Sequence, residues 1–380
     1  MNTLTIEAHA FQDAGKLCKR LPFAASKLPV LNHVEVRADK RHAFLTVATL
    51  NIRLTARIKL VHPTKEPMAF LLPPEAFRAA MKADGDSLIE MGPQTTDEGP
   101  GLALGSIQGG MALDALYPTL STSEFPPLPE LEGPTTLIPA KTLEDLARVA
   151  PAASTDSARK TLNGVFFSPE KGGMLVATDG KRLAATPAVV PMSAEFVLPS
   201  AAVKVLAHRH FTSRDLTVTV LGKARAQQIR FHSETVQLTS STLEGNFPKW
   251  QQVVPANSQA TVSLAPTEQR SVRRWLTGLK GSECTVSLRA TTTHSLELVH
   301  GRSGKAVATV EVPARVEGPV PVLQLEPKFL ATALHVGAVL HFGDALSPLV
   351  VRNARGGFCV VMPMRPTVQV QSPQARALAN

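Results

Sequence analysis

The stretch Val176-Ala177-Thr178-Asp179-Gly180-Lys181-Arg182-Leu183 carries an apolar strand pattern into a turn and leaves two cations beside it. Glycine accepts a positive φ without steric cost, so an Asp-Gly pair after a strand predicts a hairpin turn. Taken alone, the pattern indicates no more than that. Three other segments make it informative, namely Arg159–Phe167 before it, Glu244–Trp250 after it and Val360–Arg365 much later.

The sequence contains three copies of one unit. Phe70–Phe77 (FLLPPEAF) is echoed by Phe196–Val203 (FVLPSAAV), and more faintly by Leu323–Leu330 (LQLEPKFL). Each copy predicts a short strand followed by a helix with proline near its start, where the missing N–H costs nothing. A period of about 125 residues is far too long for a solenoid, so the copies are expected to be similar domains.

Two stretches indicate linkers between these domains. Pro118–Pro134 is rich in Pro, Ser and Thr without an apolar period, and Pro255–Gln259 is the second linker. Runs such as Leu216–Val220 alternate in polarity and predict antiparallel strands. Each copy is therefore expected to be an α+β domain with two helices on one face of an antiparallel sheet. The expected domains are residues 1–130, 131–257 and 258–380, the last with an extension at 367–380.

The composition is that of a soluble globular protein, with 44% apolar and 19% charged residues among 380. No apolar run approaches the roughly 20 residues that span a bilayer, and the first residues lack the pattern of a signal peptide. Cys18, Cys284 and Cys359 are far apart, with no Cys-x-x-Cys. This spacing favours a protein of the reducing cytosol and argues against a metal site, and we expect the three cysteines to be small buried side chains.

The formal net charge of +9 favours a polyanionic partner. Cations far outnumber anions on the six expected helices. On one helix such a bias usually marks a solvated face only, but its recurrence in most copies indicates a shared basic surface. The aromatic content of 5% argues against a single-strand binder, which needs stacking platforms. The helices are expected near residues 8–21, 140–150 and 266–279, and after Pro73, Pro199 and Glu326.

No catalytic residue, cofactor or metal site is expected. His208 and His210 are two residues apart, which on a helix points them in different directions. Gly301–Lys305 lacks the first glycine and the Ser/Thr of a phosphate loop, and lies between strand patterns, so it predicts a hairpin. Nucleophile-elbow and zinc-protease motifs are absent from the sequence. An enzyme with an unrecognised site stays open as a third interpretation.

In their order and spacing, the four segments quoted first resemble the bacterial sliding clamp, the β subunit of DNA polymerase III. The resemblance covers nearly the whole chain. It implies a homodimer that closes six domains into a ring around double-stranded DNA. Head-to-tail pairing would also remove exposed strand edges. The implied partners are DNA polymerase subunits, the clamp loader and repair proteins, in the cytoplasm at the nucleoid and without a membrane. The alternative is a clamp-derived peptide-binding adaptor that does not encircle DNA.

The resemblance also implies a peptide-binding pocket between domains 2 and 3, with an apolar floor and a cationic rim. Gln252 stands where the family often has arginine, and Pro366 replaces its terminal leucine. The extension after Pro366 is expected to cover part of the pocket or to redirect partner choice. The implied pocket residues are Leu162, Thr178, Gly180, Lys181, Arg182, Leu183, Pro248, Val253, Leu346, Pro348, Val360, Met362, Pro363, Met364 and Arg365.

Two further sets follow from the resemblance. Cations on inner helices and loops would face phosphates and allow sliding without base readout. Ala25 occupies the place of an arginine often found in the first of these loops. The implied DNA-binding residues are Lys19, Arg20, Lys27, Arg78, Lys82, Arg148, Arg159, Lys160, Lys204, Arg273 and Arg274. The implied dimer interface consists of Met111 and Leu113 in domain 1 and Trp275, Leu276 and Leu279 in domain 3. A buried core position for Leu276 is an equal alternative.

Overall fold

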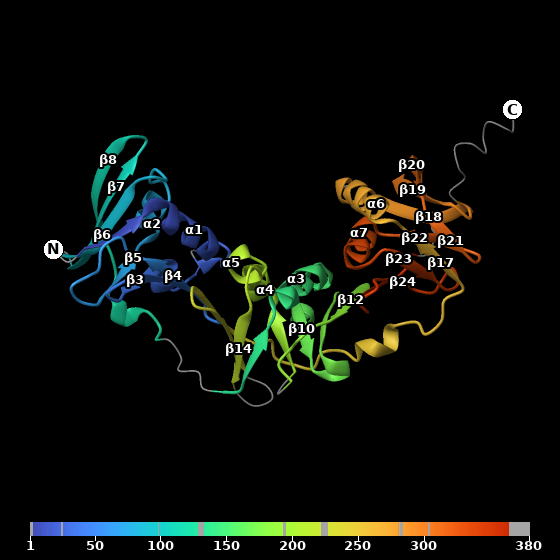
Figure 1. The fold of residues 1–380 in the computed structure, drawn as a ribbon, viewed down its shortest axis with the longest axis horizontal. Helices are drawn as coiled ribbons and strands as arrows, with labels where there is room; N and C mark the ends of the chain where they lie inside the picture. Colours follow the sequence, from blue (N-terminus) through green and yellow to red (C-terminus); the bar gives the residue numbers. More distant parts are fainter. Residues whose placement is uncertain are drawn as a thin grey trace. The chain divides into compact units, whose positions relative to one another are not determined.

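The chain folds into two compact units in this computed structural model. Unit 1 comprises Met1–Leu143 and Ala201–Thr242, and unit 2 comprises Glu144–Ser200 and Leu243–Asn380. Each unit holds one long and one short antiparallel sheet (Figure 1). The residues that the structure describes are 3–23, 26–97, 99–127, 133–192, 195–221, 227–279, 281, 284–302 and 305–364.

Unit 1 is built on an eight-stranded sheet in the order β5-β2-β3-β4-β16-β15-β14-β9, and β1-β6-β7-β8 form its short sheet. The long sheet is continuous because β4 pairs with β16, from Ala56 opposite Val236 to Ile52 opposite Ser240. The strands are β1 (Leu4–Glu7), β2 (Val34–Ala38), β3 (His42–Ala48), β4 (Ile52–Lys59), β5 (Met68–Leu72), β6 (Leu88–Thr96), β7 (Gly99–Gln108), β8 (Met111–Pro118), β9 (Thr135–Ile138), β14 (Leu216–Leu221), β15 (Gln228–His232) and β16 (Val236–Ser241).

Unit 2 repeats this plan with a nine-stranded sheet, β13-β10-β11-β12-β25-β24-β23-β17-β21, and a short sheet, β20-β19-β18-β22. Here β12 pairs with β25, with Leu183 opposite Val360. The strands are β10 (Gly164–Ser168), β11 (Met174–Thr178), β12 (Arg182–Pro187), β13 (Phe196–Pro199), β17 (Ala260–Ser263), β18 (Cys284–Thr292), β19 (Ser295–Arg302), β20 (Lys305–Pro313), β21 (Arg315–Glu317), β22 (Leu323–Leu325), β23 (Val339–Phe342), β24 (Leu349–Arg352) and β25 (Phe358–Val361).

Apart from the short α5, which was not expected, the helices lie where the sequence predicts them, and most bury an apolar stripe against a sheet. On α1, Phe11, Ala14 and Leu17 are buried at helical spacing, and the helix packs on β3 and β4. In the same way α7 packs on β24 and β25. Full burial of such a Phe or Leu side chain stabilises the fold by about 1.5–3 kcal/mol. The helices are α1 (Ala8–Cys18), α2 (Pro74–Ala80), α3 (Ala140–Val149), α4 (Ser200–Leu206), α5 (Arg209–Thr212), α6 (Pro266–Gly278) and α7 (Pro327–Val336).

The three copies share one closing contact. The edge strand before the second helix offers a backbone carbonyl to the segment that leaves the copy. Leu71 accepts from the Thr119 hydroxyl at 2.7 Å. The carbonyls of Val197 and Gln324 accept from the backbone N–H of Leu243 and Met364, at 2.9 and 2.7 Å. The expected α+β fold is thus confirmed, whereas the exact domain boundaries stay predictions.

Three smaller expectations also have outcomes. All three cysteines are buried and free, as expected, and Arg302 pairs with Lys305 in a hairpin. The expectation that His208 and His210 diverge is wrong. His208 caps the short helix α5, so the two rings stack with centroids 5.1 Å apart, and His210 Nε2 lies 2.9 Å from Asp13. Among the described residues, no group of three or more His, Cys, Asp and Glu could hold a metal.

Candidate functional site

The hairpin between β11 and β12 is held rigid by its own side chains. The hydroxyl of Thr178 accepts from the Gly180 N–H at 3.1 Å and donates to the Arg182 carbonyl at 2.7 Å. The carboxylate of Asp179 accepts from the N–H groups of Lys181 and Arg182. Gly180 has a φ of +86°, which a residue with a Cβ adopts only under strain. The sequence therefore fixes the shape of this turn locally.

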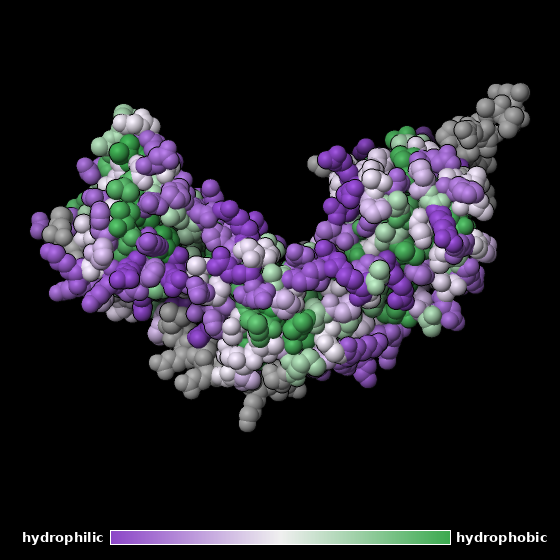
Figure 2. Space-filling model, viewed as in Figure 1, coloured by the Kyte–Doolittle hydropathy of each residue, from purple (hydrophilic) through white to green (hydrophobic). Residues whose placement is uncertain are grey.

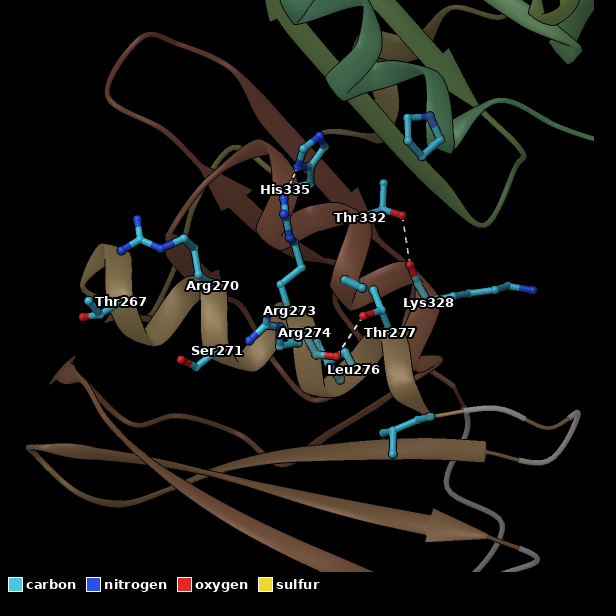
Figure 3. A pocket seen from close by; sticks show the side chains of 13 residues that line it. Thr267, Arg270, Ser271, Arg273, Arg274, Leu276, Thr277, Lys328, Thr332 and His335 are labelled. Atoms are coloured by element: carbon cyan, nitrogen blue, oxygen red, sulfur yellow. Dashed lines mark hydrogen bonds between the residues drawn. The ribbon is translucent and has the colours of Figure 1, made fainter. Parts of the chain in front are cut away.

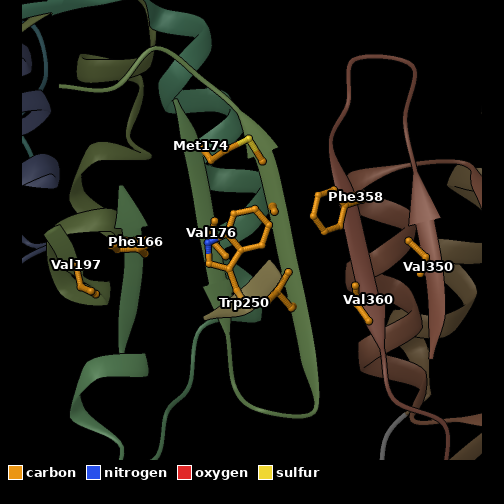
Figure 4. Packing of buried hydrophobic residues seen from close by; sticks show 10 residues of the cluster. Phe166, Met174, Val176, Val197, Trp250, Val350, Phe358 and Val360 are labelled. Carbon is orange, nitrogen blue, oxygen red and sulfur yellow. The ribbon is translucent and has the colours of Figure 1, made fainter. Parts of the chain in front are cut away.

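This hairpin borders a small cavity of about 160 Å³ in unit 2. Its floor includes the buried side chains of Leu183, Val360 and Trp250, and its rim includes the exposed Val253 and Met362. The same face of the sheet carries the apolar cluster around Trp250 and Phe358 (Figure 4). The lining residues are Leu162, Thr178, Gly180, Lys181, Arg182, Leu183, Pro248, Lys249, Trp250, Val253, Val360 and Met362.

Most of the implied pocket residues thus meet around one cavity, although they come from segments far apart in the sequence. Lys249 and Trp250 were not among them. Both belong to the quoted segment Glu244–Trp250. Its tryptophan could have indicated a cavity residue, because aromatic side chains commonly line binding cavities.

The other implied pocket residues lie elsewhere. Leu346 is 74% exposed in the loop between β23 and β24, and Pro348 lines a neighbouring cavity. Pro363 and Met364 follow β25 without lining the cavity, and Met364 makes the closing contact to Gln324. Arg365 and the extension lie outside the described residues.

The role expected for Arg182 is wrong, because its guanidinium does not form a free cationic rim. Its side chain is only 11% exposed and pairs with Asp179 at 3.0 Å. It donates to the Thr332 hydroxyl at 2.6 Å and to the Pro151 carbonyl at 2.5 Å, and it lies over the ring of Phe329. Arg182 therefore joins the hairpin to α7, and Lys181 and Lys249 supply the exposed cations of the rim.

The equivalent hairpin of unit 1 carries a different side chain at the position of Leu183. In the β3–β4 hairpin, Arg53 pairs with Ala48 as Leu183 pairs with Thr178. The guanidinium of Arg53 donates to the carbonyls of Pro126 and Pro127 and lies over the Phe125 ring. The position that Leu183 holds beside the cavity is thus taken in unit 1 by an arginine bound to the first linker.

A second, larger groove of about 920 Å³ lies on α6 and α7 of unit 2. Figure 3 shows arginine side chains on α6 beside it, and Figure 2 shows hydrophilic residues gathered over this helix. Arg273 contacts His335, whose pKa is lowered by burial and by the nearby Arg273 and Arg148. Among the described residues that line the groove there is no carboxylate. Its residues are Pro151, Thr267, Arg270, Ser271, Arg273, Arg274, Leu276, Thr277, Leu279, Lys328, Ala331, Thr332 and His335.

The other implied DNA-binding residues differ in whether their charged groups are already paired within the protein. Arg78 and Arg148 are paired with acidic neighbours on their own helices, at 3.0 and 2.6 Å. Arg159 donates to the Asp179 carbonyl at 3.2 Å and lies 3.7 Å from Asp156. The remaining cations of the set are all exposed, namely Lys19, Arg20, Lys27, Lys82, Lys160 and Lys204.

The implied dimer residues fall into two groups. Met111 and Leu113 both lie on β8, which is an edge strand of the short sheet in unit 1. Met111 is 73% exposed. Of the two alternatives for Leu276, the structure supports the core position, because its side chain is 1% exposed within its own unit. Trp275 packs edge-on against His300, and Leu279 lines the basic groove. One edge strand of the short sheet in unit 2 is β20, whose side chains are mostly exposed.

Comparisons with known proteins agree on one family. Residues 137–249 match the family described as DNA polymerase III beta subunit, central domain. The Beta sliding clamp of Bacillus subtilis is 28% identical over 263 residues, which cover 65% of this chain and 68% of that protein. The Beta sliding clamp of Chlamydia pneumoniae is 23% identical over 370 residues, or 93% and 97%. The resemblance to the bacterial sliding clamp is confirmed.

Solved sliding-clamp structures share the fold. The DNA polymerase III subunit beta of Pseudomonas aeruginosa aligns with a TM-score of 0.78 at 22% identity, covering 96% of this chain and 100% of that chain. A sliding clamp from Bartonella birtlesii bound to griselimycin aligns with a TM-score of 0.79 at 21% identity, covering 96% and 99%. None of the helices that the structure describes is long and apolar enough to span a membrane.

Replacing Arg182 tests its structural role. Arg182→Met should lower the free energy of unfolding by about 2–4 kcal/mol, because it leaves Asp179 without its ion-pair partner and removes the bond to Thr332. Arg182→Lys should lose less, since lysine keeps the charge without the planar fork. Urea titration measures both. Arg355→Met, at an exposed arginine, is the control and should change stability by at most about 0.5 kcal/mol. Equal losses in Arg182→Met and Arg355→Met would contradict the role.

Proposed function

We propose that this chain is a DNA sliding clamp that tethers DNA polymerase and other replication or repair proteins through the cavity beside Leu183. The convergence of the hairpin, the segment Pro248–Val253 and the last strand on this cavity is the observation that carries the proposal. A small apolar cavity with two lysines at its rim suits an apolar peptide anchor flanked by polar or acidic groups. Met362, unbranched and exposed, can adapt to different anchors.

DNA binding is assigned first to the α6–α7 groove. Arg270 and Arg274 are exposed beside it, and the described residues that line it include no carboxylate, so phosphates would meet little competition there. Lys328 is also exposed, but it is paired with Glu326 at 2.5 Å and is less free to bind phosphate. Such contacts attract the duplex without reading its sequence, and this allows sliding. Lys160 and Lys27 are exposed on loops and supplement the groove. Arg159, engaged with Asp156 and Asp179, contributes less.

Ring closure is assigned to the free strand edges. The short sheets end in β8 and β20, each with an unpaired edge within its own unit. Pairing β8 of one copy with β20 of another would extend both sheets and hide the exposed Met111, Leu116 and Val307. Two such contacts related by twofold symmetry close a homodimer. This assembly would act on DNA in the cytoplasm, at the nucleoid.

The non-encircling adaptor is the weaker alternative. An adaptor needs the cavity but neither the basic groove nor two complementary sheet edges. Since the chain keeps all three features, a clamp accounts for more of its surface. We assign no catalytic role to any residue.

The cavity is tested by titrating a fluorescein-labelled clamp-binding peptide. Met362→Asp should weaken binding by about tenfold or more, because it places a charge on the apolar rim. Fluorescence polarisation measures the affinity. Leu137→Asp makes the same change at an exposed leucine of β9 and should leave binding unchanged. Met364→Ala should have the smaller effect expected of a residue outside the cavity. Unaltered binding by Met362→Asp would show that the site lies elsewhere.

The groove is tested through the salt dependence of duplex binding. Replacing Arg270 and Arg274 together with alanine should reduce the log–log salt slope by about 1.8 if each contacts one phosphate, since each contact contributes about 0.9. Filter binding across a salt series measures the slope. The matched control replaces Arg41 and Lys65, two exposed cations of unit 1. If both pairs lower the slope equally, general charge accounts for binding and the groove does not.

The edge pairing predicts a mass of about 81 kDa, twice the 40.6 kDa of one chain. Leu113→Arg should shift the protein to the monomer in sedimentation equilibrium, because a cation in the strand pairing is costly to bury. The exposed Leu137→Arg serves as control and should stay dimeric. A parent protein that is monomeric at micromolar concentration would refute the closed ring.

A further inference from the structure

A second cavity, of about 240 Å³, lies on the same sheet face as the first. Val360, on the floor of the first cavity, pairs with Val350, which lines the second. Val350 pairs in turn with His341 on β23. Directly paired residues point to the same face of a sheet, so the cavities are neighbours across β25, β24 and β23. The second cavity is lined by Pro255, Ala256, Asn257, Ser258, His341, Gly343, Pro348, Val350 and Arg352.

The register gives the spacing between the two cavities. Each cross-strand pair separates its residues by about 5 Å, so His341 lies about 10 Å from Val360. An extended peptide covers about 3.3 Å per residue, so roughly three residues connect the cavities. Pro348, which the sequence assigned to the peptide pocket, lies in the second cavity. Because Leu349 pairs with Val361, Pro348 lies close to Met362 at the rim of the first.

The two cavities differ in chemistry. The first is mainly apolar, whereas the second presents Arg352, His341, Ser258 and Asn257. Within the part of the chain that the structure describes, the Arg352 side chain has no hydrogen bond or ion pair, and its guanidinium lies over the ring of Phe358. It is therefore a half-buried cation without a counter-charge.

His341 adds a neutral partner. Burial, and after it the positive charge of Arg352, lower the pKa of His341, so its ring is uncharged near neutral pH. Its Nδ1 lies 3.5 Å from the Ser258 hydroxyl. The described residues that line the cavity include no carboxylate. The nearest acidic loop residue in sequence, Asp344, accepts from the N–H groups of Leu346 and Ser347 and caps its own loop.

We propose that this second cavity binds the side-chain carboxylate of an aspartate or glutamate in the partner peptide, about three residues from its apolar anchor. The inference rests on the proposed function of the first cavity. Arg352 supplies the charge, and the hydroxyl and imidazole groups supply hydrogen bonds to the carboxylate oxygens. Partners would thus be distinguished by an acidic residue at a fixed distance from the anchor, and not by the anchor alone.

Selection from a random peptide library on the full-length chain tests this. Peptides selected on the parent should carry an apolar anchor with Asp or Glu about three residues away. Peptides selected on Arg352→Gln should keep the anchor and lose the acidic preference. Arg355→Gln removes a neighbouring exposed arginine that lines neither cavity, and should select the same peptides as the parent. Thermal unfolding checks that both variants are folded.

One selected peptide then enters a double-mutant cycle. Changing its acidic residue to the amide should weaken binding to the parent about five- to tenfold, as expected for a charge-assisted bond. The same change should have no effect on Arg352→Gln. An equal loss on both proteins, or selected peptides without an acidic preference, would overturn the inference. A carboxylate preference found only at the peptide C-terminus would also overturn it. If selected peptides bind Met362→Asp as well as the parent, the proposed function itself fails, which is a separate outcome.

Discussion

The pairing of β12 with β25 is the interaction on which the candidate site depends. It makes one nine-stranded sheet from strands of the second and third copies and sets Leu183 beside Val360. Arg182, the first residue of β12 in this pairing, fixes the hairpin to α7 through Asp179 and Thr332. Two cavities open on one face of the resulting sheet, and Pro151, Lys328 and Thr332, which Arg182 contacts, line the basic groove. The contact surfaces proposed for peptides and for DNA therefore share one structural support.

The long sheet of unit 1 repeats the plan of unit 2 with a different side chain at the corresponding hairpin position. Its β4–β16 pairing repeats the geometry of β12 and β25. Arg53 occupies the position of Leu183 and bonds to the carbonyls of the first linker. One position of the hairpin thus carries a linker contact in one unit and borders a cavity in the other.

Sequence patterns predicted the parts of this account that depend on local signals. The repeated strand-proline-helix motif placed α2, α4 and α7, and the Asp179–Gly180 turn placed the hairpin. The resemblance predicted most residues of the first cavity, because they lie in the family's motifs. It did not predict the role of a side chain that has two possible surroundings. Arg182 was assigned to the solvent rim, yet burial beside Asp179 and Phe329 holds it inside. Leu276 faces the core of its own unit, a choice between helix faces that spacing alone did not decide. The second cavity needs the register of β23 and β24, which no local pattern contains.

The central claim is that the protein encircles DNA. A comparison of circular with linear DNA tests this claim more directly than a measurement of affinity does. The full-length protein would be loaded onto a nicked circular plasmid by the clamp loader of the same cell with ATP, and then separated from free protein by gel filtration at high salt. High salt screens ordinary attraction between cations and phosphates but cannot release a closed ring. We predict that the protein stays with the circle and leaves once the plasmid is cut at one site. Equal loss from circular and linear DNA at the same salt would contradict the clamp.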